Sequence, residues 1–198
     1  MNGDRPLRNL LISEAWPGAP LRVLLAATGL ALVVSANSGK LPSGALWTVV
    51  LYAAFALLLA GAILAGRAFP GVQRLFVSDL ARALLLGTSL IDLVYISLLV
   101  LHSGGPLSDA YLLYPLLMLK VALLFPALPE IAAVAALSGP AYAGVLYVVA
   151  GGWLFLADSF FPWRFLILMA NAVGGVGLGA VIASGQRRLQ EMEAGLSS

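Results

Sequence analysis

The chain contains no cysteine, and only one of its 198 residues is histidine. Without cysteine it can form no disulfide, no thiolate metal site and no thiol nucleophile. One histidine and nine scattered acidic residues do not suggest a protein-built metal site either, and no nucleophile–base pair can be assembled from them. We therefore expect no catalytic residues, no metal centre and no enzymatic activity in this chain.

Charge is also scarce. Charged residues make up 10% of the chain, against about 25% in an average soluble domain. Hydrophobic residues make up 61%, and the mean hydropathy is +0.99. A water-soluble fold could not keep this much apolar surface away from water, so the solvent must be lipid. No basic run is long enough for nucleic acid, which we do not expect as a partner.

Six apolar stretches are candidates for membrane-spanning helices, which need about 20 apolar residues each. Glycine, proline and polar residues separate them, and none shows strand-like alternation. The predicted spans cover residues 21–37, 45–66, 83–102, 108–125, 130–150 and 162–184. The sequence thus predicts an all-α integral membrane protein, a six-transmembrane-helix bundle. Residues 1–20 would form an N-terminal tail and residues 186–198 a polar exit helix.

Basic residues are distributed unevenly between the two ends of these spans. With a cytoplasmic amino terminus, the outer segments hold only Lys40 and Arg164. The inner segments hold Arg5, Arg8, Arg22, Arg67, Arg74, Arg82, Lys120, Arg187 and Arg188. Because cytoplasmic loops carry an excess of Lys and Arg, both termini are predicted to be cytoplasmic. A cleaved signal peptide ending near residues 35–38 is the alternative for the first span, and it would leave five spans.

Two ionisable residues lie deep within predicted spans. Asp92 is about 15 Å and Lys120 about 17 Å from the short outer loop, at a rise of 1.5 Å per residue. Adjacent antiparallel helices could therefore place them opposite each other, as a buried ion pair at a ligand or proton site. The alternative is that Lys120 snorkels to the cytoplasmic face while Asp92 is neutral or bonded to Ser89 or Ser97.

Three further features are candidates for a role in sensing or packing. His102 would suit a pH sensor at the outer mouth, because imidazole changes charge near neutral pH. It could equally be a polar residue that ends a helix at the interface. Gly175 and Gly179 are four residues apart in the sixth span, which favours close helix–helix packing. The spacing leaves open whether that contact lies within one chain or between two.

The outer loop and the fourth predicted span, residues 102–116, read His-Ser-Gly-Gly-Pro-Leu-Ser-Asp-Ala-Tyr-Leu-Leu-Tyr-Pro-Leu. This segment resembles the membrane sensor region of bacterial two-component histidine kinases of the RegB and PilS type. In that group a six-helix bundle carries a Gly-Gly loop between its third and fourth spans, then an apolar helix and a proline-containing turn. Residues 125–129 take the place of that turn, and the Arg187-Arg188 exit resembles the connection to a kinase core. The resemblance covers most of residues 83–198 in layout.

The loop of RegB-like members reads Gly-Gly-x-x-Asn-Pro-Phe and is associated with quinone sensing. This chain has Gly104 and Gly105, but Ser108, Asp109 and Ala110 stand where that pattern has Asn, Pro and Phe. PilS-like members are therefore more similar to it. Only the two glycines are carried over, as loop-forming residues, and we expect no cofactor, with quinone as the alternative.

The resemblance implies a sensor in the bacterial inner membrane that relays a periplasmic or intramembrane signal to a cytoplasmic kinase or response-regulator pathway. The 13 residues of 186–198 cannot hold a kinase core, so the chain is either the sensor portion of a longer protein or a stand-alone bundle. Expected partners are membrane lipid and a second copy bound through the exit helix. There Leu189, Met192 and Leu196 fall three and four residues apart, as in a coiled-coil seam, although a frayed polar tail would also fit. A small transporter and an accessory subunit of a larger membrane complex are the alternative functions.

Overall fold

Helices form all the regular structure in the described part of the chain, which comprises residues 18–37, 43–68, 78–125, 128–157 and 159–196 of a computed structural model. The N-terminal tail up to residue 17, Lys40 and Arg74 lie outside these residues. The α-helices are α2 (Ala19–Ala36), α3 (Ser43–Ala68), α5 (Ser78–His102), α6 (Leu113–Leu124), α7 (Leu128–Ala150) and α8 (Phe160–Leu196). The 3₁₀ turns are η2 (Gly105–Leu107), η3 (Asp109–Leu112) and η4 (Trp153–Ala157).

Within the described ranges, five helices are long and apolar enough to cross a membrane. These candidate spans are Ala19–Ala36, Ser43–Leu64, Ala83–His102, Pro129–Ala150 and Phe160–Ile182. Their outward surface is apolar: Leu57 and Leu58 of α3 are 72% and 75% exposed. Extensive exposed apolar surface marks contact with a membrane or a partner, so the chain has the architecture of a multi-pass helical membrane protein.

The fourth predicted span, residues 108–125, is not one continuous helix. It begins with η3, and α6 has only 12 residues. At 1.5 Å per residue α6 is about 18 Å long, which is less than the roughly 30 Å of a hydrocarbon layer. Pro115 sits in the first turn of α6, where its missing N–H costs no helical hydrogen bond. At the other end Phe125 is extended (φ −98°, ψ 121°), as expected for a residue that precedes a proline.

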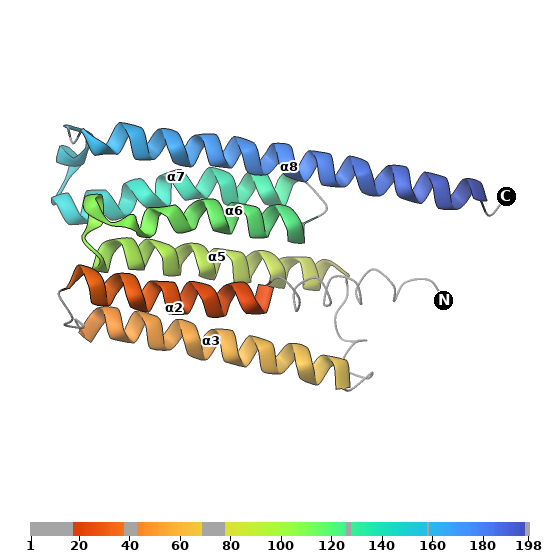
Figure 1. The fold of residues 1–198 in the computed structure, drawn as a ribbon, viewed down its shortest axis with the longest axis horizontal. Coiled ribbons are helices and arrows are strands. Elements are labelled where there is room, and N and C mark those ends of the chain that lie inside the picture. The colour runs from red at the N-terminus through yellow and green to blue at the C-terminus, as the bar shows by residue number, and fades with distance from the viewer. Residues whose placement is uncertain (1–17, 38–42, 69–77, 126–127, 158, 197–198) are drawn as a thin grey trace.

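The helices lie side by side along one axis (Figure 1). In that view α5 lies between the α2–α3 pair and the group formed by α6, α7 and α8. Half of the membrane-spanning part of α5 is buried, compared with 17% for α3 and α8. Consequently α5 is the central helix, and its polar side chains must find their hydrogen-bond partners inside the bundle.

The last helix, α8, is the longest described element. It has 37 residues and includes both the sixth predicted span and the exit segment up to Leu196. Its length is about 55 Å at 1.5 Å per residue. Figure 1 shows its carboxyl-terminal part extending beyond the ends of the other helices. One uninterrupted helix therefore joins the end of the bundle that carries η2 and η3 to the exit segment.

The glycines of α8 are of two kinds. A Cβ on Gly175 would lie 3.4 Å from Cβ of Met118 on α6, and a Cβ on Gly179 would overlap Cδ1 of Ile131 on α7. A Cβ on Gly174 or Gly177 would meet no atom within 4 Å. Gly175 and Gly179 thus make close contacts within this chain, whereas Gly174 and Gly177 face open space.

We predict that Gly179→Leu destabilises the bundle by about 1–3 kcal/mol, because its side chain needs space that Ile131 already fills. The matched change Gly177→Leu, on the same helix but facing open space, should cost less than about 0.5 kcal/mol. The free energy of unfolding would be measured by SDS titration of the purified chain in mild detergent. Equal losses for the two variants would contradict the observed packing.

Candidate functional site

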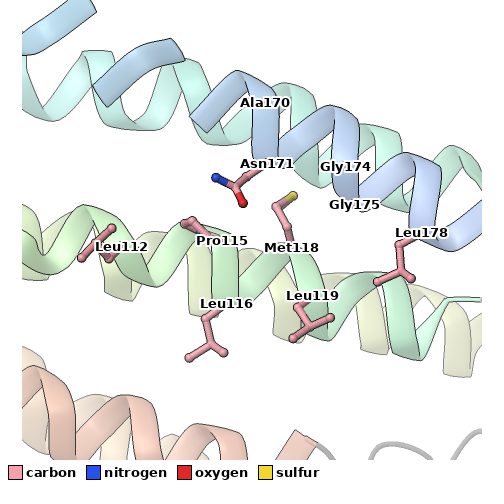
Figure 2. A pocket seen from close by; sticks show the side chains of 10 residues that line it. All are labelled: Leu112, Pro115, Leu116, Met118, Leu119, Ala170, Asn171, Gly174, Gly175 and Leu178. Atoms are coloured by element: carbon pink, nitrogen blue, oxygen red, sulfur yellow. The ribbon is translucent and has the colours of Figure 1, made fainter. Parts of the chain in front are cut away.

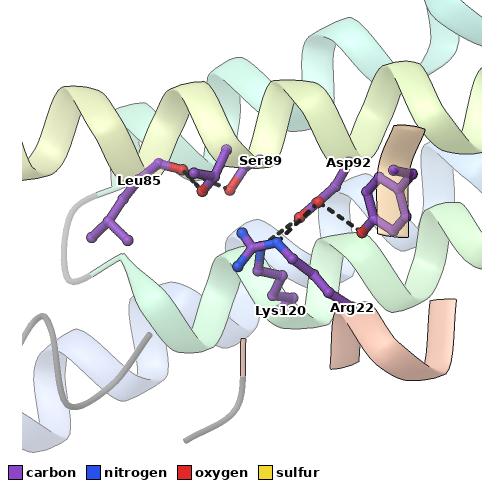
Figure 3. Close-up of polar contacts among 7 residues, drawn as sticks. Arg22, Leu85, Ser89, Asp92 and Lys120 are labelled. Atoms are coloured by element: carbon purple, nitrogen blue, oxygen red, sulfur yellow. Dashed lines mark hydrogen bonds and ion pairs between the residues drawn. The ribbon is translucent and has the colours of Figure 1, made fainter. Parts of the chain in front are cut away.

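Asp92 occupies the centre of the bundle, near the middle of α5, and is fully buried. Figure 3 shows Arg22 and Lys120 converging on its carboxylate. Lys120 Nζ donates to Oδ2 at 2.5 Å, and Arg22 Nε donates to Oδ1 at 3.2 Å. The hydroxyl of Tyr52 donates to the same Oδ1 at 2.9 Å. One carboxylate therefore joins α2, α3, α5 and α6.

These contacts decide between the two interpretations of Asp92 and Lys120. Lys120 is 1% exposed and pairs with Asp92 rather than snorkelling to the surface. The neighbouring serines bond elsewhere: Ser89 donates to the Leu85 carbonyl and Ser97 to the Leu93 carbonyl. Of the two alternatives that the sequence left open, the structure therefore has the buried ion pair.

The charges of this cluster are held where isolated charges would be very unfavourable. Arg22, Lys120 and Asp92 are each at most 1% exposed. Removing one partner of such an arrangement leaves an uncompensated buried charge, which costs about 3–5 kcal/mol. Ionisable groups at this depth mark either a functional site or a strong structural tie between helices.

Stacked tyrosines cover one side of the cluster. The rings of Tyr52 and Tyr95 are 3.6 Å apart between centroids and nearly parallel, at 4°. The Tyr95 hydroxyl lies 3.5 Å from the Leu25 carbonyl, over Gly29 of α2. A Cβ on Gly29 would overlap that hydroxyl and lie 2.7 Å from Cδ1 of Leu99. Gly29 therefore allows α2 to approach α5 closely enough for Arg22 to reach Asp92.

The loop between α5 and α6, the predicted outer loop, consists of the 3₁₀ turns η2 and η3 and begins at two glycines. Gly104 and Gly105 have φ values of +110° and +56°, which favour glycine. A Cβ on Gly105 would also lie 2.8 Å from Cγ1 of Val149. Both predicted glycines therefore lie in the loop, and Gly105 additionally allows the loop to approach α7.

One cation ties this loop to α8. Arg164 Nη1 donates to the carbonyls of Pro106 and Ser108, the latter at 3.1 Å. Its guanidinium also lies 4.5 Å from the centre of the Tyr111 ring. The Ser108 hydroxyl bonds to that of Ser103 and accepts from the Ala110 N–H at 3.0 Å. We name this contact between Arg164 and the loop the outer clamp.

His102 is half-buried at the end of α5, away from the Asp92 cluster. Its carbonyl accepts a hydrogen bond from Asn37 Nδ2 at 3.3 Å, and Cε1 of its ring would lie 3.2 Å from a Cβ on Gly44. The structure thus divides the predicted sensing residues into two groups. Asp92 and Lys120 are paired in the core, and His102, Gly104 and Gly105 lie at the end of α5 and in the loop that follows it.

Three side chains of these two groups were not singled out by the sequence. Arg22 and Arg164 had been counted only as inner and outer cations, and Tyr52 had not been noted. Arg22 did carry a signal, because a charge just inside an apolar stretch needs a partner. Tyr52 carried none, because a tyrosine in a span is ordinary.

No known protein-family model matches the chain, and no curated protein or solved structure matches it either. Among the described residues, no three His, Asp or Glu side chains are grouped so that they could hold a metal ion. The geometry of the bundle is therefore the basis for its proposed function.

We predict that Asp92→Asn and Lys120→Met each destabilise the bundle strongly. Asp92→Asn should cost about 3–5 kcal/mol, because Arg22 and Lys120 then lose the carboxylate that pairs with them. The double variant should lose clearly less than the sum of the single losses, because the two residues are coupled. SDS titration in detergent would give the three free energies of unfolding.

The control for this double-mutant cycle of Asp92 and Lys120 combines Asp92→Asn with Ser138→Ala. Ser138 is buried on α7 and donates to the Val134 carbonyl of its own helix. That combination should be additive to within about 0.5 kcal/mol. Additive losses for Asp92 and Lys120 as well would mean that the two side chains do not interact.

The contribution of the Tyr52 hydroxyl to stability can be measured separately from that of its ring. Tyr52→Phe removes one hydrogen bond to a buried carboxylate and should cost about 1.5–3 kcal/mol. Tyr95→Phe keeps the same stack and removes only a contact of 3.5 Å, so it should cost less than about 1 kcal/mol. The same unfolding assay compares them, and a larger loss for Tyr95→Phe would refute the assignment.

Proposed function

We propose that the chain is a membrane sensor module that relays a periplasmic or intramembrane signal to a cytoplasmic histidine-kinase output. In this proposal the protein lies in the bacterial inner membrane with six spans and both termini in the cytoplasm. It has no catalytic role of its own. The observation that carries the proposal is the continuity of α8 from the outer clamp to the exit segment.

The outer clamp is at the beginning of α8, and the exit segment is at its end. Arg164 is the fifth residue of α8, and it holds the carbonyls of Pro106 and Ser108. A change in the loop would therefore act directly on α8. Because α8 is one uninterrupted helix from Phe160 to Leu196, a tilt or shift at its start would be transmitted along its length.

The Asp92 cluster supplies the fixed part against which such a movement would occur. Its ionic and hydrogen-bond contacts tie α2, α3, α5 and α6 together. By contrast, α8 meets α6 and α7 through glycine and apolar contacts, such as Gly175 against Met118. Apolar contacts are less directional than ion pairs, so two packings of α8 on this core can be close in free energy.

The relay can be tested by joining a complete histidine-kinase core after Ser198 and measuring autophosphorylation in membrane vesicles. Arg164→Gln removes the outer clamp and should change the phosphorylation rate at least twofold. The neighbouring control Trp163→Phe, at a position 69% exposed, should leave the rate unchanged. A rate insensitive to Arg164→Gln, or equally sensitive to Trp163→Phe, would count against the relay.

A small transporter is the second candidate, and the buried ionisable cluster favours it, because proton paths through membranes use such groups. The test is proton uptake by vesicles that contain the purified chain, followed with a trapped pH dye. A transporter should show uptake above that of empty vesicles and lose it in Asp92→Asn. Uptake equal to that of empty vesicles would exclude proton transport.

A further inference from the structure

Arg164, the cation of the outer clamp, uses only part of its guanidinium there. Its Nη1 donates to the carbonyls of Pro106 and Ser108, which accounts for both N–H groups of that nitrogen. Nε and Nη2 carry the other three N–H groups, and the described residues provide no hydrogen-bond acceptor for them. These two nitrogens lie on one edge of the guanidinium, where parallel N–H groups match the two oxygens of an oxyanion.

The positive charge of Arg164 is balanced only by neutral groups within the described part of the chain. The ion pairs of that part belong to the Asp92 cluster, and none includes Arg164. Asp109 lies on the clamped loop, but it is exposed and makes no ion pair with Arg164. The remaining partners of the guanidinium are two carbonyls and the ring of Tyr111. An anion placed on the open edge would therefore form charge-assisted hydrogen bonds.

An open groove runs between α6 and α8 on the membrane side of the clamp. Figure 2 shows Leu112 at one end of this groove and Leu178 at the other. Asn171 and Met118 point toward each other across it. Its volume is about 500 Å³, within the range of about 300–1,000 Å³ that is common for ligand sites. Asn171 donates to the Ile167 carbonyl of its own helix at 2.7 Å, and the rest of the lining is apolar.

The clamp and the groove lie on the same side of α8. Arg164, Asn171 and Leu178 are spaced by seven residues, nearly two helical turns, so they follow one another along one face. On the facing wall, the ring of Tyr111 lies 4.5 Å from the guanidinium, and the next residue, Leu112, lines the groove. The two features therefore form one site, with a cation at its head and apolar walls below. We name Arg164 and this groove the acyl site.

The depth of the acyl site favours a carboxylate that is joined directly to an alkyl chain. From Arg164 to Gly174 the helix rises about 15 Å, which is half of a roughly 30 Å hydrocarbon layer. A Cβ on Gly174 would meet no atom within 4 Å, so the groove is open at that depth. Arg164 lies four residues inside the candidate span Phe160–Ile182, whereas the phosphates of a bilayer lie outside its hydrocarbon layer.

We propose that the acyl site binds a long-chain carboxylate, an anionic amphiphile with one alkyl chain. The carboxylate accepts hydrogen bonds from Nε and Nη2 of Arg164, and the chain lies in the groove against α6 and α8. Such a ligand is bound at one defined site, unlike the lipid that surrounds the whole bundle. This inference does not depend on the sensor function, since a transporter or an accessory subunit could bind the same ligand.

The class of ligand can be tested with radiolabelled palmitate and the purified chain in phosphatidylcholine nanodiscs. Palmitate should bind saturably, one molecule per chain. Hexadecanol has the same chain without the charge and should displace palmitate about tenfold less effectively. Acetate, which has the head without the chain, should not displace it. No saturable binding, equal displacement by hexadecanol, or displacement by phosphatidylglycerol as effective as that by palmitate would each overturn the proposal.

Two substitutions of Arg164 separate its charge from its hydrogen bonds to the loop. Arg164→Gln should weaken palmitate binding about tenfold, whereas Arg164→Lys should largely retain it, because only lysine keeps the charge. Both side chains can still donate to the carbonyls of Pro106 and Ser108. The difference between the two variants therefore reports the anion contact rather than the clamp. Equal palmitate affinities for the two variants would contradict the assignment of Arg164.

A third variant tests whether the alkyl chain lies in the groove. Gly174→Phe places a ring where the groove is open and should weaken palmitate binding about tenfold. The matched control Val173→Phe is at the neighbouring position, which is 73% exposed and does not line the groove, and it should bind palmitate normally. SDS titration would verify that both variants are folded. Unchanged binding in folded Gly174→Phe, or an equal loss in Val173→Phe, would overturn the proposal.

Discussion

The structure depends on keeping one carboxylate in the middle of an apolar bundle. Asp92 has no access to solvent, so its negative charge must be compensated inside the protein. Arg22, Lys120 and Tyr52 provide that compensation from three other helices. Their positions in turn fix how α2, α3 and α6 sit against α5. In a membrane, where apolar surfaces do not drive helices together, such polar contacts specify which helices associate and in what register.

The last helix, α8, takes no part in these contacts with Asp92 and packs in a different way. The face of α8 that meets α6 and α7 makes close contacts at Gly175 and Gly179. On another face of the same helix, a Cβ on Gly174 would meet no atom within 4 Å. Glycine spacing in the sequence could not distinguish these two faces, because Gly174 and Gly175 are adjacent. The distinction arises only when α6 and α7 are placed. A core tied by ion pairs next to a helix packed by apolar contacts is what the proposed relay requires.

The sequence predicted the helical membrane class and offered the Asp92–Lys120 pair as one of two alternatives, because hydropathy and depth can be counted along the chain. It could not predict Arg22 or Tyr52 as partners, since their helices lie 70 and 40 residues away along the sequence. Hydropathy also could not predict where the helix of the fourth span begins, because it counts apolar residues whatever their backbone conformation. Pro115 and the turn before it were the readable signs that α6 begins late.

The late start of α6 has a consequence for how the bundle meets lipid. About 18 Å of helix leaves part of a 30 Å layer to be matched by the turns that precede it. There Leu107 and Leu112 are 71% and 52% exposed, and Arg164 donates hydrogen bonds to the loop carbonyls of Pro106 and Ser108. On this side of the bundle the 3₁₀ turns η2 and η3, rather than a regular helix, would lie at the edge of the hydrocarbon layer. When the bilayer thickens or thins, the resulting hydrophobic mismatch would then first change the surroundings of these turns and of Arg164.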